Sequence, residues 1–196
     1  MIAGHYATAL IPKARSPELP IAWLLLAANF PDFVWVALGF AGIETPHPVS
    51  ILDATFANIR VRMTFSHDVL PILVHSAAFA AVVLLAGRGR RLAAWCAALV
   101  VLHLGCDLVS GFEHHLWGPG SPSIGLDTYG RAPHVALLIE AMTSFACVFY
   151  YDRSCRERGR PLSRGRRLGL YGVLVGGVVV WLPTATMSLA RILGLH

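Results

Sequence analysis

The chain has 196 residues, of which 56% are hydrophobic and only 14% are charged. Soluble globular proteins carry about 25% charged residues, so this composition excludes an ordinary soluble domain and favours an integral membrane protein. The formal net charge is +5, but the basic residues are clustered between apolar segments, which indicates membrane topology rather than nucleic-acid binding.

The first apolar segment, residues 2–11, is too short to span a membrane and ends at Pro12-Lys13-Ala14-Arg15, because a span needs about 20 apolar residues. If this segment re-enters the membrane as a short helix, it carries His5 to mid-membrane depth. The alternative is an interfacial helix that lies flat on the membrane surface.

Five later segments are long enough to span a membrane. They cover residues 19–42, 69–86, 92–110, 133–151 and 168–189. The first of them is interrupted by Asn29-Phe30-Pro31-Asp32. We therefore predict an all-α polytopic helical bundle in which residues 1–196 form a single integral membrane domain.

Arginines are concentrated in two of the links between spans. The link before residue 92 and the link before residue 168 contain Arg88, Arg90, Arg91, Arg153, Arg156, Arg158, Arg160, Arg164, Arg166 and Arg167. The positive-inside rule places both links, and the N-terminal region, on the cytoplasmic side of a cell (inner) membrane. The C-terminus then lies outside.

Four ionisable side chains are expected at similar depth in the outer half of the membrane. His103 and Asp107 share one helix face at i and i+4, ~18 and ~24 Å from the inner end of their span at 1.5 Å per residue. Asp32, in the interrupted span, and His67, at the start of the second span, lie at comparable depth. Such groups in a membrane are usually paired, metal-bound or functional.

Imidazole and carboxylate groups from three helices suit a divalent metal ion. We expect zinc, with manganese, iron or nickel as alternatives. A metal with an open coordination position activates a water molecule as a nucleophile. Two structural alternatives remain: Asp32 as a helix cap, and a His103–Asp107 pair without metal.

Four further polar residues have open roles. Glu140 lies mid-span, where a carboxylate is a ligand, a general base or the partner of a buried histidine. His75 either supports the site or bonds to a neighbouring helix. His114 and His115 are interfacial loop residues, or one of them is a ligand.

Residues 2–140 resemble a known family through the segments Gly4-His5, Pro31-Asp32, Ser66-His67, His75-Ser76 and His103-Leu104-Gly105-Cys106-Asp107. That family is the membrane-bound metal-dependent hydrolases of the YdjM/YbcI type, a domain family of unknown function. The order Asp, His, HxxxD is also similar to zinc-dependent phospholipase C and P1-type nuclease.

The resemblance implies that one metal is held by Asp32, His67, His103 and Asp107. His5 would help to hold a second metal, with Asp107 as a bridging ligand as one option. The phospholipase pattern has a later HxxxE, whereas the position four residues before Glu140 is Ala136.

The leading hypothesis is a membrane-embedded hydrolase of an ester or phosphoester, with a lipid-borne substrate as one option. Its catalytic residues would be Asp107 and Glu140, and its partner is the lipid bilayer rather than nucleic acid. The alternatives are a transporter or channel with a His/Asp site for protons or cations, and a structural membrane protein.

Overall fold

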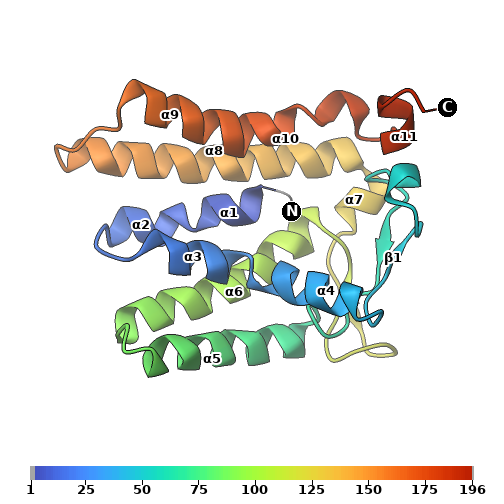
Figure 1. The fold of residues 1–196 in the computed structure, drawn as a ribbon, viewed down its shortest axis with the longest axis horizontal. Helices are drawn as coiled ribbons and strands as arrows, with labels where there is room; N and C mark the ends of the chain where they lie inside the picture. Colours follow the sequence, from blue (N-terminus) through green and yellow to red (C-terminus); the bar gives the residue numbers. More distant parts are fainter. Residues whose placement is uncertain (1–2, 196) are drawn as a thin grey trace.

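The protein is mainly helical, as a computed structural model of residues 3–195 shows. Helices account for 64% of the structure, and the described strands form two small two-stranded sheets. The long helices run side by side, with their connections gathered at two opposite ends of the bundle (Figure 1). The prediction of an all-α architecture is confirmed.

The first half of the chain builds one side of the bundle. Its helices are α1 (Gly4–Thr8), α2 (Leu10–Arg15), α3 (Ile21–Ala28), α4 (Phe30–Phe40), η1 (Ile51–Asp53) and α5 (Val69–Leu85). Its strands, paired antiparallel, are β1 (Pro46–His47) and β2 (Arg60–Val61).

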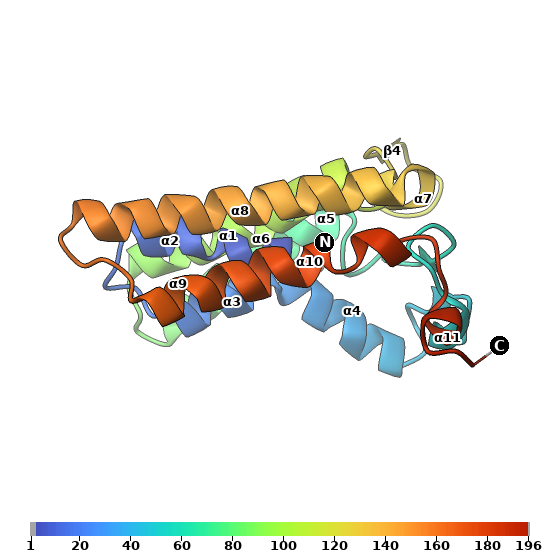
Figure 2. The same ribbon diagram turned by 90° about the horizontal axis from the view of Figure 1, so that it is seen from above.

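The second half contributes the central helix and the outer layer. Its helices are α6 (Arg90–Ser110), α7 (Thr128–Arg131), α8 (Pro133–Glu157), α9 (Arg164–Tyr171), the π-helical η2 (Gly172–Gly176), α10 (Gly177–Val179), η3 (Leu182–Thr184) and α11 (Leu189–Ile192). Its antiparallel strands are β3 (His114–His115) and β4 (Ser123–Ile124). Figure 2 shows α9 and α10 following α8 along its length.

Fewer helices than the five expected are long and apolar enough to span a membrane. Within the described residues three qualify, at Arg90–Ser110, Pro133–Glu157 and Arg164–Thr184. The pair α3 and α4 becomes a fourth if it is counted as one span, although the two helices are bent by 57°. Helix α5, at 17 residues, is too short for this count.

The bend between α3 and α4 lies at the interruption noted in the sequence. Asn29 leaves the helical conformation, and its side-chain nitrogen donates to the carbonyl of Leu25. Pro31 lies in the first turn of the next helix, where its missing N–H breaks no hydrogen bond. The carbonyls at the end of α3 are thus left without helical partners, which matters for the site.

Helix α1 packs against α6 and α8, and helix α2 packs against α8 and α3. His5, Ala7 and Thr8 are buried. The N-terminal segment is therefore part of the packed bundle.

The arginine-rich connections all lie at one end of the bundle. The α2–α3, α5–α6 and α8–α9 links share that end, while both small sheets and α7 lie at the other (Figure 1). Within the arginine-rich end, buried Asp152 pairs with Arg156 at 3.0 Å and with Arg167 at 3.3 Å, which ties α8 to α9. The two ends therefore differ in charge, as expected of a protein that crosses a membrane.

If the bundle spans a bilayer, its two ends must be reached by solvent from opposite sides. We expect Ser121→Cys and Arg164→Cys, each in a Cys155→Ser background, to be labelled by a membrane-impermeant maleimide from opposite faces of sealed vesicles. The background protein without an added cysteine is the control. Labelling of both positions from one face would contradict a spanning orientation.

Candidate metal centre

Five of the side chains singled out in the sequence come together in the middle of the bundle. His5 lies on α1, Asp32 lies on α4, and His67 lies two residues before α5. His103 and Asp107 both lie on α6. All except Asp32 are buried. Two overlapping groups of donors, each with its ligand atoms within 4.8 Å of one another, could hold a metal ion: His5, His103 and Asp107, and Asp32, His67 and His103.

Neighbouring donor atoms are spaced like ligands that share an ion, although Asp32 and Asp107 fall in different donor groups. The Nε2 atoms of His67 and His103 are 3.1 Å apart. Asp32 Oδ1 lies 3.4 Å from the first and 3.7 Å from the second. Asp107 Oδ2 lies 3.3 Å from Nε2 of His103 and 3.9 Å from Nε2 of His67. Ligands around a tetrahedral zinc, with bonds of about 2 Å, are about 3.3 Å apart.

The hydrogen bonds behind the two rings fix where their protons lie. His103 Nδ1 is 2.8 Å from the carbonyl of Ala28, which can only accept, so Nδ1 carries the proton. Ser66 Oγ donates to Glu44 at 2.6 Å, and therefore accepts from His67 Nδ1 at 2.8 Å. In the neutral rings both Nε2 atoms thus present lone pairs to each other. This arrangement fits a bound cation and is unfavourable without one.

Asp107 connects the two donor groups. Its Oδ2 faces His103, while its Oδ1 lies 3.2 Å from His5 Nε2. The His5 ring stacks on the His103 ring, with centroids 3.5 Å apart. A Cβ at Gly111 would lie 2.9 Å from Asp107 Oδ1, so the close approach of the next loop requires glycine there.

Glu140 belongs to neither donor group within the described residues, and its carboxylate faces the start of α1 instead. Its Oε1 accepts from the backbone N–H groups of Ala3 and Gly4, at 2.5 and 3.0 Å, and its Oε2 accepts from the Tyr129 hydroxyl at 2.6 Å. Burial raises the pKa of Tyr129, which keeps this donor protonated. In this position Glu140 holds the helix that carries His5, and the ligand or base role expected from the sequence stays a prediction.

Sequence reasoning missed Glu44. It lies in the loop after α4, where a carboxylate is ordinarily solvated, and no motif marks it. In the fold it is fully buried and accepts from the N–H groups of Phe65 and Ser66 as well as from the Ser66 hydroxyl. Glu44 thus fixes the segment that presents His67.

Three further histidines, His75, His114 and His115, lie near the centre but belong to neither donor group. His75 Nε2 lies 2.9 Å from the carbonyl of Phe65 and so contacts the backbone two residues before His67. His114 is buried and stacks on His67, with ring centroids 5.7 Å apart. Burial lowers the pKa of His114 to about 4, so it is neutral at pH 7. His115 donates its backbone N–H to Asp68.

Comparisons of the chain with protein-family models, with curated proteins and with solved structures each find no match.

Because Glu44 orients a donor through Ser66, its substitution should weaken metal binding without removing a ligand. We expect Glu44→Gln to lower the affinity for zinc by about 10- to 100-fold. The measurement is a competition titration against a fluorescent chelator. Asp53→Asn changes an exposed carboxylate and should leave the affinity at the wild-type value. Equal affinities for both variants would refute the orienting role.

The contact of Glu140 with α1 predicts a local loss of stability. Glu140→Ala leaves two backbone N–H groups and a buried hydroxyl unpaired, which should cost about 1–3 kcal/mol per lost charge-assisted bond. Hydrogen exchange of residues 3–8 should accelerate. Glu157→Ala, on the exposed end of the same helix, is the control and should leave this exchange unchanged. Unaltered exchange in Glu140→Ala would rule out the anchoring role.

Proposed function

We propose that this protein is a membrane-embedded, metal-dependent hydrolase of an ester or phosphoester bond. The observation that carries the proposal is the 3.1 Å approach of two imidazole nitrogens, on His67 and His103, whose lone pairs face each other beside two carboxylates. Such a set of acceptors in an apolar bundle repels itself unless a cation lies among them. The resemblance of residues 2–140 to membrane-bound metal-dependent hydrolases points to the same chemistry.

The donor set indicates the class of metal. Histidine nitrogens and carboxylate oxygens, without cysteine, suit zinc, and also manganese, iron or nickel. When bound, such an ion polarises a carbonyl or phosphoryl oxygen and lowers the pKa of a water molecule.

The protein side chains divide into orienting and reacting groups in this proposal. Hydrogen bonds at Nδ1 hold the rings of His67 and His103 in place. The side chain of Asp107 is only 8% exposed and lies among histidines. Asp32 is different, because its side chain is 39% exposed while its Oδ1 faces both histidines. We assign Asp32 as the carboxylate that meets the substrate and that accepts a proton at Oδ2.

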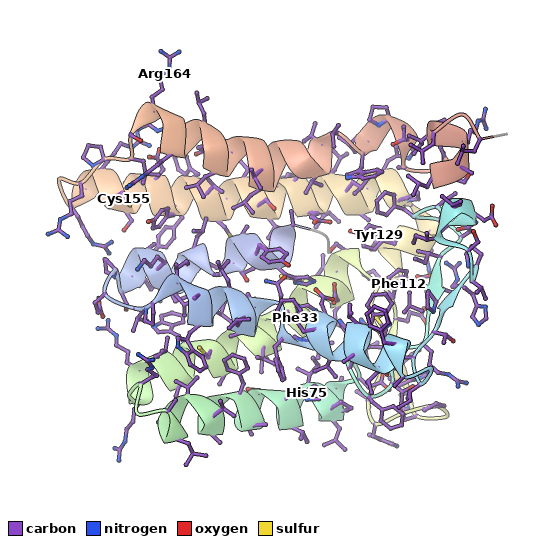
Figure 3. The ribbon with its side chains drawn as sticks, in the orientation of Figure 1. Phe33, His75, Phe112, Tyr129, Cys155 and Arg164 are labelled. Atoms are coloured by element: carbon purple, nitrogen blue, oxygen red, sulfur yellow. The ribbon has the colours of Figure 1, made fainter. Side chains whose placement is uncertain are left out.

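The surroundings of Asp32 favour a lipid-borne substrate. Asp32 lies at the start of α4, whose neighbouring Phe33 is 44% exposed and whose last residue, Phe40, is 91% exposed. Figure 3 places Phe33 beside the junction of α3 and α4. A substrate that reaches Asp32 therefore passes along apolar surface, which is suited to an acyl or prenyl chain.

Metal analysis tests the first half of the proposal. We expect purified wild-type protein to retain about one or two divalent ions per chain by mass spectrometry of the metals, and His103→Ala plus Asp107→Ala to retain at least tenfold less. His134→Ala removes an exposed histidine of α8 and should retain as much as wild type. Equal, negligible metal in all three proteins would refute the metal centre.

Hydrolysis by the zinc-loaded protein tests the second half. We expect bis-p-nitrophenyl phosphate or p-nitrophenyl butyrate to be cleaved by wild type and His134→Ala, and Asp32→Asn to be at least 100-fold slower, a loss of the size that removing a catalytic acid or base produces. Metal retention by wild type with no cleavage of either compound, or of a phospholipid in vesicles, would leave the metal centre and refute the hydrolase.

A further inference from the structure

A continuous groove runs along the outside of the bundle, on the side covered by α9. The part of the groove farther from the arginine-rich end has a volume of about 570 Å³. It is lined only by apolar surface from α1, α2, α3, α9 and η2. Leu10, Ile21, Gly169 and Leu170 also line an adjoining cavity of about 440 Å³ nearer the arginine-rich end. Lys13 and Tyr151 line both this second cavity and a third cavity of similar size.

The groove is open because the last apolar helix, Arg164–Thr184, buries little of its surface against the rest of the protein. Only 6% of the most apolar window of Arg164–Thr184 is buried inside the protein. Gly169 leaves space on the groove wall, since a Cβ added there would meet no atom within 4 Å. An apolar groove between membrane helices is filled by lipid rather than by water.

The end of the groove nearest the arginine-rich end of the bundle is basic. Lys13, Arg158, Arg160 and Arg166 line it, and none of the described residues along the groove is acidic. None of these four cations pairs with a carboxylate among the described residues, whereas Arg153, Arg156 and Arg167 nearby all do. Positive charge is thus left unbalanced where the groove ends.

Two of these basic groups are already held in place by the protein. Lys13 Nζ donates to the carbonyls of Pro17 and Leu19, both at 2.6 Å, and Arg158 donates to the carbonyl of Ala14. Neither contact neutralises the charge. Fixed cations of this kind lose little conformational entropy when they bind an anion.

The length of the groove matches one leaflet of a bilayer. From Lys13 to Ala3 the helical path covers ten residues, or ~15 Å at 1.5 Å per residue. Half of the hydrocarbon core is also about 15 Å thick. A headgroup at the basic end would therefore place its acyl chain along the apolar part.

We propose that this groove is a specific binding site for an anionic phospholipid of the leaflet that faces the arginine-rich end. The phosphate is bound by Lys13, Arg158, Arg160 and Arg166, and one acyl chain lies against α1, α3 and η2. Basic pockets between membrane helices are suited to such headgroups. The proposal is independent of the metal centre and of hydrolysis.

Matched substitutions on one helix test the site. Gly169→Leu fills the groove, while Gly165→Leu makes the same change on α9 at a position that also has open space and does not line it. Arg166→Gln removes a lining charge, while Arg164→Gln removes one that points away from the bundle (Figure 3). Circular dichroism verifies that all four variants are folded.

The measurement is the affinity of the full-length protein in detergent for dioleoyl phosphatidylglycerol, by native mass spectrometry, with dioleoyl phosphatidylcholine as the neutral-headgroup comparison. We expect wild type to favour phosphatidylglycerol, and Arg166→Gln to bind it about fivefold more weakly, as the loss of one basic group predicts. Gly169→Leu should be weaker still, and both controls should match wild type.

Three results would overturn the proposal. Equal weakening in Arg164→Gln and Arg166→Gln would mean a diffuse attraction to the whole basic end. Equal affinity of wild type for the two lipids would mean a purely apolar groove. Displacement of phosphatidylglycerol by millimolar inorganic phosphate would assign the basic end to the free anion.

Discussion

The structure is organised around four acceptor groups that face one another in an apolar bundle. Imidazole lone pairs and carboxylates in such a position are unfavourable unless a cation balances them. The polar atoms on the far side of each group must also have hydrogen-bond partners. The protein meets the second condition with hydrogen bonds from the far side of each ring, to Ala28 for His103 and to Ser66 for His67. The helix break, the loop after α4 and the short N-terminal helix all contribute to this support.

The break between α3 and α4 serves the centre in two ways. The end of α3 leaves carbonyls without helical partners, and the carbonyl of Ala28 accepts the proton of His103 Nδ1. The same interruption starts α4 at a new angle, so that Asp32, in its first turn, reaches both histidines. A straight helix through Asn29 would satisfy its own carbonyls and would lose both contacts.

The second structural theme is the difference between the two ends of the bundle. At one end some arginines are paired, as around Asp152, and others line the groove beside α9. At the other end small sheets and turns cover the centre, with His114 packed on His67. The proposed lipid site and the proposed active site therefore depend on different residues, and variants can separate them.

The sequence alone determined the helical class, the position of the helix break and the residues of the centre. Apolar runs, a proline between the polar residues Asn29 and Asp32, and ionisable groups in apolar surroundings are local features whose physical effect depends little on the rest of the chain. It overestimated the number of spans, because α5 has only 17 residues and because α3 and α4 are two helices bent by 57° rather than one span.

Only the tertiary structure decided the roles of the two buried glutamates. The sequence left Glu140 open as a ligand, a base or the partner of a histidine, and in the fold it accepts hydrogen bonds from the start of α1, which depends on how α8 packs against the N-terminus. Glu44, from a loop with no motif, is buried behind His67. Hydrogen-bond partners more than 20 residues apart in the chain are set by packing, and no local pattern encodes them.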